Sequence, residues 1–219
     1  MTSNKNSATA KKGSLFIISA ASGTGKTTLV QAIAGISSTL LVSVSHTTRA
    51  RRSDEGDGVA YHFVNEETFS DMVKQDLFLE HATVFGHQYG TSREWVEEQL
   101  ETGNDVILEI DWQGAQQVKS KMPDVVSVFL LPPSYQSLEQ RLFSRGEDNE
   151  DTIKQRMQEA KKEISHYKEF GYIVINDEFD RAFGDLVAMV RTVSHSRYRH
   201  PHYFDNFVKQ LVEEGDQIQ

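Results

Sequence analysis

Short apolar segments that alternate with helical stretches indicate an α/β fold with a mainly parallel sheet. Five segments read as buried strands, at residues 15–18, 40–45, 106–111, 125–131 and 173–176. A glycine-rich turn between the first strand and the first helix is the second indication, because P-loop proteins bind phosphate at that turn. We therefore expect a three-layer P-loop domain built on a five-stranded core sheet.

The first half of the chain divides into a regular part and an irregular part. Residues 15–18 form a continuous apolar run that suits a strand buried on both faces, and a helix over residues 26–34 follows it. Residues 40–45 read as the next strand. Between residues 46 and 89 charged, aromatic and glycine residues mix, and helical periodicity survives only at residues 66–74. We expect a small mixed α/β subdomain here, over about residues 45–91.

The second half returns to alternating helices and strands. The segment Thr91-Ser92-Arg93-Glu94 has the form of a capping box, and it predicts a helix that Gly103 stops. The remaining strands and helices are predicted, in chain order, at residues 106–111, 125–131, 134–144, 151–169, 173–176 and 179–193.

The two ends of the chain differ from the body. Residues 1–13 are polar and are expected to form a disordered arm, so the domain would span residues 14–193. Residues 194–219 carry a His- and Arg-rich patch and then an amphipathic segment near 203–214. We expect a partly helical tail that packs on the body or joins copies into a homo-oligomer. The spacing in the patch defines no metal site.

Composition excludes several classes of protein. The 219 residues carry a net charge of −9 and contain no cysteine. A nucleic-acid coat is disfavoured, since such surfaces are usually basic, and disulfides and thiolate metal sites are excluded. We find neither an apolar run of ~20 residues nor a secretory signal at the N-terminus. We expect a cytoplasmic protein that binds neither nucleic acid nor membrane.

The strongest motif is a phosphate-binding loop between the first strand and helix. Its glycines let successive backbone N–H groups surround a phosphate, and the helix N-terminus faces the anion. A lysine can neutralise the β- and γ-phosphates, and the threonine after it can bind Mg²⁺. Ala20 stands where the full pattern has glycine. The predicted ATP-binding residues are Ala20, Ala21, Ser22, Gly23, Thr24, Gly25, Lys26, Thr27 and Thr28.

A second anion site is indicated after the second strand. Arg49, Arg51 and Arg52 lie within four residues of an otherwise acidic protein. Planar guanidinium groups hold phosphate through paired hydrogen bonds. A solvated basic turn is the alternative for this cluster taken alone.

Five further motifs follow the loop in order. They are Ser-x-x-Thr-Arg-x-x-Arg at residues 45–52, Glu-x-x-Gly-x-x-Tyr at 55–61, Phe-Leu-Glu at 78–80, Tyr-Gly-Thr at 89–91 and Ile-Asp-Trp-Gln-Gly at 110–114. In this combination they closely resemble the guanylate kinase family, whose members phosphorylate GMP with ATP. The resemblance covers about residues 14–193.

The resemblance implies roles for residues of the second site. The GMP phosphate would be held by Arg49, Arg52, Tyr61 and Tyr89, and Glu55 would orient the arginines. The guanine would be read by Ser45, Glu80 and Thr91, helped by Asp111. Guanine offers two adjacent donors that one carboxylate can accept, and adenine has no such pair. The alternatives are an exposed strand-end carboxylate for Glu80 and a helix cap for Thr91.

The resemblance also implies a helical lid over about residues 141–156. Its arginines, Arg141, Arg145 and Arg156, would reach the ATP phosphates and the transferring phosphoryl group. Asn176 would contact the adenine side. Ordinary surface ion pairs for the arginines and a strand-terminating role for Asn176 stay open.

Mg²⁺ is the implied cofactor, held through the ATP phosphates. Thr27 would supply a hydroxyl and Glu109 an acid, at a place where the family usually has Asp. A simple strand-end acid is the equal alternative for Glu109.

These features predict an ATP:GMP phosphotransferase that also accepts dGMP and acts in purine metabolism. Two alternatives stay open: a non-catalytic binding module related to the same family, and a kinase for another nucleoside monophosphate. The retained Lys26 and Thr27 argue against the first, and Glu80 with Thr91 argues against the second. A GTPase is disfavoured because the chain lacks an Asn-Lys-x-Asp motif.

Overall fold

Five parallel strands form the central sheet of the computed structural model, which describes residues 11–53, 55–144, 150–196 and 200–216. Their order across the sheet is β2, β7, β1, β8, β9, and each neighbouring pair is parallel. The strands are β1 (Leu15–Ala20), β2 (Leu40–Val42), β7 (Asp105–Glu109), β8 (Val126–Leu131) and β9 (Tyr172–Ile175). The predicted α/β fold with a five-stranded core is confirmed.

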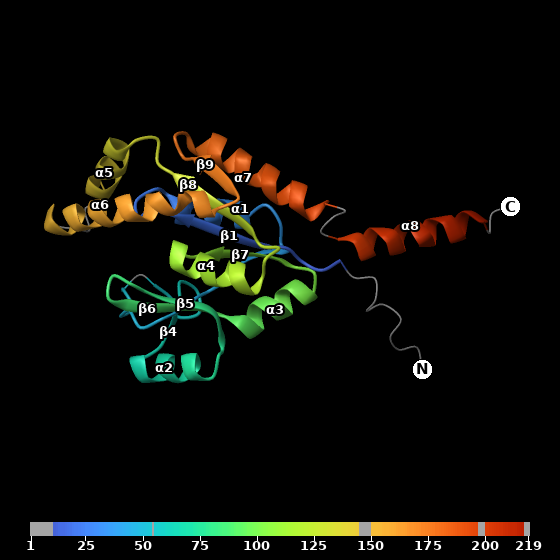
Figure 1. Ribbon diagram of the computed structural model, residues 1–219, viewed down its shortest axis with the longest axis horizontal. Coiled ribbons are helices and arrows are strands. Elements are labelled where there is room, and N and C mark those ends of the chain that lie inside the picture. The colour runs from blue at the N-terminus through green and yellow to red at the C-terminus, as the bar shows by residue number, and fades with distance from the viewer. Residues whose placement is uncertain (1–10, 54, 145–149, 197–199, 217–219) are drawn as a thin grey trace.

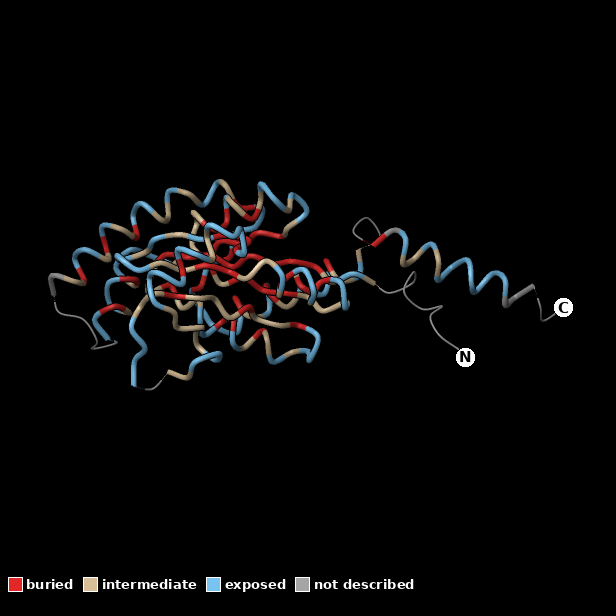
Figure 2. Tube along the Cα trace, turned by 90° about the horizontal axis from the view of Figure 1, so that it is seen from below, coloured by how far each residue is buried: buried red, intermediate tan, exposed pale blue. Residues whose placement is uncertain are grey.

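Helices cover both faces of this sheet (Figure 1). Successive strand side chains point to opposite faces, so β1 supplies both layers. Phe16 and Ile18 pack with apolar residues of α1 (Lys26–Ala34) and α7 (Phe179–Ser194). Leu15 and Ile17 pack on the opposite side with residues of α3 (Arg93–Glu101) and α4 (Trp112–Lys121). Figure 2 shows the buried residues running through the middle of the body.

A second, four-stranded sheet lies in the irregular part of the sequence. Its order is β4, β3, β6, β5, in which β6 is antiparallel to β3 and β5 while β3 and β4 are parallel. The elements are β3 (His46–Thr47), β4 (His62–Phe63), α2 (Glu66–Lys74), β5 (Phe78–Val84) and β6 (His87–Ser92). The mixed sheet and α2 agree with the expected α/β character of this insert.

Two further helices pack against the phosphate loop. They are α5 (Tyr135–Ser144) and α6 (Glu150–Ser165), and the 3₁₀ turn η1 (His166–Glu169) follows α6. Their buried residues form a small cluster that includes Ala21 of the loop. Figure 1 places both helices at the end of the molecule opposite α8. The region between them, residues 145–149, lies outside the described residues.

The structure corrects several details of the predicted elements. The strand predicted over residues 106–111 ends at Glu109, and Asp111 instead caps α4 by accepting a hydrogen bond from the Gly114 backbone N–H. The sequence reading missed α4 because a glycine in its first turn weakens the helical pattern. Helix α3 is capped by Ser92, not by Thr91. The helix predicted over residues 151–169 becomes 3₁₀ after Ser165. The strand predicted over residues 40–45 is shorter, since β2 ends at Val42.

Helix α8 (Pro201–Asp216) projects from the body in both ribbon and trace views (Figures 1 and 2). None of the side chains described at residues 202–213 is buried.

At the other terminus the Gly13 backbone N–H donates to the Leu100 carbonyl, while residues 1–10 lie outside the described range. The disordered arm and the homo-oligomer both stay predictions. In the described part of the chain, no helix combines the length and apolarity needed to cross a bilayer.

Candidate active site

The phosphate loop runs from the end of β1 into α1. Gly23 and Gly25 have φ angles of 86° and 95°, which side chains rarely adopt, and Gly25 forms the N-cap of α1. A Cβ atom on Gly25 would also approach the Asn176 amide nitrogen to 2.7 Å. Both glycines are therefore required by the shape of the loop, which turns the N-terminus of α1 toward an anion.

Three polar side chains meet at the start of α1. Thr27 Oγ1 donates to Glu109 Oε1 at 2.5 Å, and Lys26 Nζ lies 4.0 Å from the same oxygen. Lys26 Nζ also lies 3.4 Å from the Ile110 carbonyl oxygen. Glu109 thus faces the loop, and its part in binding Mg²⁺ stays a prediction.

These residues fit Mg²⁺ chemically, because Thr27 and Glu109 present oxygen ligands to one point. They are two of the roughly six oxygens that the ion takes. In the described part of the chain, no group of three or more His, Cys, Asp or Glu side chains could hold a metal ion. Nucleotide phosphates and water would have to supply the other ligands.

Two predicted ATP-side residues hold the backbone of the loop. The Asn176 amide is buried and donates to the Thr24 carbonyl at 2.7 Å. Arg141 donates to the same carbonyl at 3.0 Å and to the Asn176 carbonyl at 2.9 Å. Arg141 therefore makes contacts with the loop backbone, in contrast to an ordinary surface ion pair.

The other two lid arginines are placed differently. Arg145 lies outside the described residues. The Arg156 guanidinium lies 5.7 Å from the centre of the Phe85 ring, at the tip of the β5–β6 hairpin. This cation–π contact joins α6 to the second sheet.

The arginine cluster after β2 is partly organised by Glu55. Arg49 donates to Glu55 Oε1 at 2.5 Å, and the Arg52 backbone N–H donates to Oε2 at 2.9 Å. The hydrogen bond from Arg49 lowers the pKa of Glu55, and the same bond raises the pKa of Arg49. Glu55 thus contacts the Arg49 side chain and the Arg52 backbone, and its role in orienting these arginines for a phosphate stays a prediction.

Two tyrosines lie beside Arg49. The guanidinium carbon lies 5.3 Å from the centre of the Tyr61 ring, and the rings of Tyr61 and Tyr89 are 5.7 Å apart. Burial raises the pKa of Tyr61 to about 12, so its hydroxyl keeps its proton near neutral pH. The group offers several donors to one anion.

Glu80 is the buried carboxyl group of the second site. It is 3% exposed and accepts a hydrogen bond of 2.5 Å from Thr91 Oγ1. Burial raises its pKa to about 7, and this outweighs the opposing effect of Thr91. A Cβ atom on Gly114 would overlap Glu80 Oε2, so the glycine leaves room for the carboxyl group. Glu80 is thus no exposed strand-end acid, and Thr91 is no helix cap.

One cavity of about 270 Å³ joins the two halves of the site. It takes part of its lining from the phosphate loop and part from the second sheet. Predicted residues along it are Ala20, Ala21, Ser22, Gly23, Gly25, Lys26, Thr27, Ser45, Tyr61, Glu80, Tyr89, Glu109 and Asp111. Thr24, Thr28, Arg49, Arg52, Glu55, Thr91, Arg141, Arg156 and Asn176 do not line it.

Sequence reasoning missed five residues of the cavity: Ala82, Val84, Phe85, Ile110 and Glu163. Glu163 of α6 and Phe85 of the β5–β6 hairpin line it. Glu163 accepts from the Ser22 backbone N–H, a partner 141 residues away, so no local pattern could indicate it. Phe85 has a φ angle of 50° and is followed by Gly86 at 79°, and a Phe-Gly pair between two strands was a usable turn signal.

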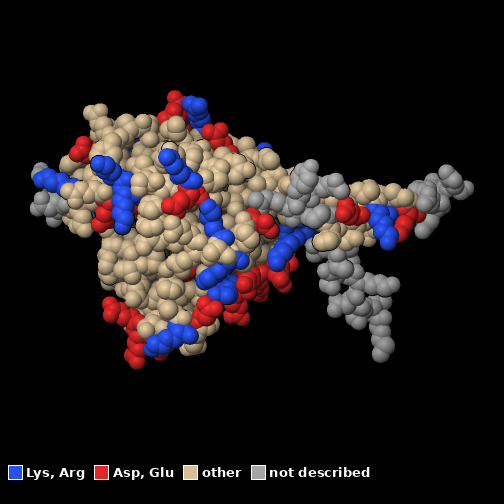
Figure 3. All heavy atoms as spheres, in the orientation of Figure 1, with Lys and Arg blue, Asp and Glu red and all other residues tan. Residues whose placement is uncertain are grey.

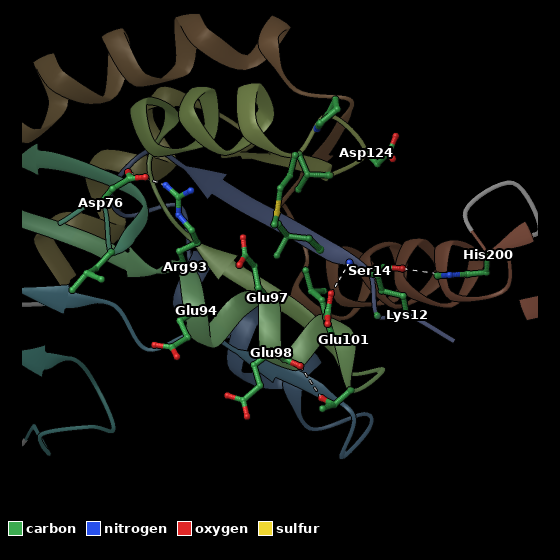
Figure 4. A pocket seen from close by; sticks show the side chains of 18 residues that line it. Lys12, Ser14, Asp76, Arg93, Glu94, Glu97, Glu98, Glu101, Asp124 and His200 are labelled. Atoms are coloured by element: carbon green, nitrogen blue, oxygen red, sulfur yellow. Dashed lines mark hydrogen bonds and ion pairs between the residues drawn. The ribbon is translucent and has the colours of Figure 1, made fainter. Parts of the chain in front are cut away.

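A larger cavity, of about 1070 Å³, lies away from these residues, beside α3 (Figure 4). Its rim is acidic, since Glu94, Glu97, Glu98 and Glu101 all line it. Figure 3 shows acidic side chains gathered over α3. It contains no predicted site residue and would repel a nucleotide phosphate, so the smaller cavity is the candidate active site.

Fold and site together define a P-loop protein whose loop shares one cavity with a buried carboxyl group of the second sheet. The sequence model of the family described as guanylate kinase matches residues 12–193. The guanylate kinase of Saccharophagus degradans is 55% identical over 178 residues, covering 81% of this chain and 87% of the relative.

Two further similarities extend this result. The guanylate kinase of Pseudomonas fluorescens is 50% identical over 200 residues, covering 91% of this chain and 97% of the relative. The crystal structure of guanylate kinase from Anaplasma phagocytophilum aligns with a TM-score of 0.72 at 31% identity, covering 87% of this chain and 90% of that one. The chain belongs to the guanylate kinase family.

Proposed function

We propose that this chain transfers the γ-phosphoryl group of ATP reversibly to GMP, giving ADP and GDP. The observation that carries the proposal is the single cavity that joins Lys26 of the phosphate loop to the buried Glu80. We extend the proposal to dGMP as an acceptor and to GMP recycling in the cytoplasm. The named relatives are guanylate kinases, which supports the catalytic reading over the binding module.

The guanine would lie against Glu80, and Thr91, which does not line the cavity, would act on it through its hydrogen bond to that carboxyl group. An ionised Glu80 accepts hydrogen bonds from both N1–H and N2–H₂ of guanine, and Thr91 holds the carboxylate in place. Adenine presents no such donor pair, and a site built around a hydrogen bond rejects the analogue that lacks it by up to ~10⁴–10⁵. Ser45 and Asp111 line the same cavity and would complete the contacts to the base.

The GMP phosphate would lie at the other end of this site. Arg49 and Arg52 supply positive charge, and Tyr61 and Tyr89 supply hydroxyl donors. Glu55 holds Arg49 through a 2.5 Å hydrogen bond. This pairing stiffens the guanidinium before the substrate arrives, so less rotamer freedom is lost on binding.

The transfer itself needs little covalent help from the protein. A GMP phosphate oxygen attacks the γ-phosphorus, the bond from that phosphorus to the ADP oxygen breaks, and ADP leaves with the electron pair. Lys26 and the loop N–H groups would stabilise the charge that spreads over the moving group. Mg²⁺, held by Thr27 and Glu109, would neutralise phosphate charge when bound. No side-chain base is required, because the attacking oxygen is already anionic.

The lid arginines divide into two roles in this proposal. Arg141 and Asn176 would position the loop through the Thr24 carbonyl, which both contact. Arg145 and Arg156 would reach the ATP phosphates as the lid closes. Closure would also keep water from the γ-phosphoryl group.

A coupled ADP-release assay tests the function. ATP and Mg²⁺ are combined with GMP, dGMP, AMP, CMP, UMP or TMP, and Lys26→Ala serves as the control. We expect turnover with GMP and dGMP alone, reduced at least ~10²-fold in the variant. Folded protein that binds GMP without any turnover would favour the binding module. Turnover with another monophosphate would overturn the assignment of Glu80.

A further inference from the structure

A carboxylate of the protein itself accepts a hydrogen bond from one of the backbone N–H groups of the phosphate loop. Glu163 Oε2 accepts a hydrogen bond from the Ser22 backbone N–H, with 3.2 Å between nitrogen and oxygen. Glu163 belongs to α6, outside the loop and its helix, and it lines the same cavity as Lys26. Glu163 Oε2 therefore lies where a phosphoryl oxygen would lie if it accepted a hydrogen bond from the same N–H.

The charges of the cavity make this contact unfavourable for a bound nucleotide. Among the described residues that line it, four are carboxyl groups (Glu80, Glu109, Asp111 and Glu163), and Lys26 is the one lysine or arginine. Glu109 has a role beside Mg²⁺ and Glu80 beside guanine, but Glu163 faces the loop N–H directly. Like charges at such distances repel strongly where water is scarce.

Packing ties Glu163 to the rest of the loop. Ile153, Met157 and Ala160 of α6 form one cluster with Ala21 of the loop and with α5. Burial raises the pKa of Glu163, while the nearby Lys26 charge opposes that rise. A nucleotide that takes over the Ser22 N–H must displace the Glu163 side chain or shift this part of α6.

We propose that Glu163 is a resident anion of the phosphate loop, which competes with the terminal phosphoryl group of ATP for the Ser22 N–H. The inference rests on the proposed function for the identity of the nucleotide. Glu163 satisfies a backbone donor that would otherwise lie partly buried without a partner. When ATP binds, the exchange couples occupation of the loop to the position of α6.

Binding of ATP and ADP to Glu163→Gln, measured by calorimetry in excess Mg²⁺, tests the proposal. Glutamine keeps the shape and an acceptor oxygen but removes the charge. We expect ATP to bind about fivefold to tenfold more tightly than to the original chain. ADP lacks the terminal phosphoryl group, so its affinity should change less than about twofold.

The matched control is Glu159→Gln, which removes the same charge one turn earlier on the same helix. Glu159 accepts from Gln155 at 3.3 Å and does not line the cavity. Its ATP affinity should stay within about twofold of the original value. An equal gain in both variants would mean a general charge effect and would overturn the specific exchange.

Other outcomes also decide the question. Unchanged or weaker ATP binding to Glu163→Gln would make Glu163 a support of the loop, against the proposal. If thermal unfolding shows that this variant is misfolded, Glu163→Ala, which lacks any acceptor, must show the same gain for ATP over ADP. The proposed function is scored separately: the original chain could bind ATP as expected here and still fail to phosphorylate GMP.

Discussion

Glu80 combines burial with a function that requires its charge. Burial raises the pKa of its carboxyl group to about 7, whereas the guanine donors need the ionised form. The native state therefore holds this proton more tightly than the unfolded chain, and Glu80 reduces stability as pH rises from about 4.5 to 7. Substrate recognition and stability thus make opposite demands on one side chain.

The pH dependence of GMP binding follows from this. Below pH 7 the ionised fraction of Glu80 falls, so KM for GMP should rise by up to about tenfold per pH unit, while KM for ATP changes little. Initial rates between pH 6 and 8.5 measure both constants. The GMP phosphate also titrates in this range, so Glu80→Gln is the necessary control.

Glu80→Gln should have a KM for GMP raised by about tenfold to a hundredfold at pH 8, because one hydrogen bond to a charged group is lost. Its remaining pH dependence should be that of the GMP phosphate alone. If both proteins gave the same profile, Glu80 would not be the group that reads guanine.

Gly114 gives a second prediction about one residue. In most helix interiors alanine is more favourable than glycine by about 0.5–1 kcal/mol. At Gly114 the added Cβ would overlap Glu80 Oε2, so Gly114→Ala should displace the carboxyl group and raise KM for GMP at least about tenfold.

The matched control is Gly184→Ala in α7, where an added Cβ meets nothing within 4 Å. This variant should be more stable by about 0.5–1 kcal/mol, with unchanged kinetics. Thermal unfolding and GMP titrations of the two proteins make the comparison. A Gly114→Ala protein with normal KM for GMP would contradict the role given to this glycine.

At the junction of β6 and α3, two neighbouring residues have different roles: one stabilises the helix and the other contacts Glu80. Ser92 caps α3 by accepting from the Trp95 backbone N–H, while Thr91 donates to Glu80. Ser92→Ala should therefore lower the free energy of unfolding by about 0.5–2 kcal/mol and leave KM for GMP unchanged.

Thr91→Val, in contrast, should raise KM for GMP. It keeps the shape of the side chain but removes the hydroxyl that donates to the buried carboxyl group of Glu80, so KM for GMP should rise about fivefold to a hundredfold. Chemical denaturation and GMP kinetics of both variants test the pair. A larger kinetic effect from Ser92→Ala than from Thr91→Val would show that the cap, not the hydroxyl of Thr91, controls the site.

What the sequence could predict of these elements depended on how local their signals are. The phosphate loop and all five core strands were recognisable within windows of a few residues. Helix α4 was missed because Gly114, which Glu80 requires, lowers helical propensity. The contacts of Glu163 with Ser22 and of Arg141 with Thr24 join distant segments, and only the folded chain brings them together.

At the scale of the whole molecule, α8 is the helix that packs least against the rest of the described chain, and no role in the proposed site is assigned to it. Ser14 and the buried His200 approach to 3.4 Å at its base, yet the described side chains beyond residue 201 are not buried. Four apolar residues are at least half exposed along it: Phe207, Val208, Leu211 and Val212. An isolated helix of this length is marginal in water, so we expect α8 to be stabilised by a partner surface.

A chain that ends at residue 200 tests the prediction that this partner is a second copy. The truncated protein keeps His200 and every described active-site residue, so kcat and KM should be unchanged. Sedimentation velocity should give a larger mass for the full chain as concentration rises, and a constant monomer mass for the truncated one. Equal masses would rule out association through α8, whereas lost activity would place α8 within the catalytic body. Because apolar exposed surface drives such association, Leu211→Glu should reproduce the truncation without shortening the chain.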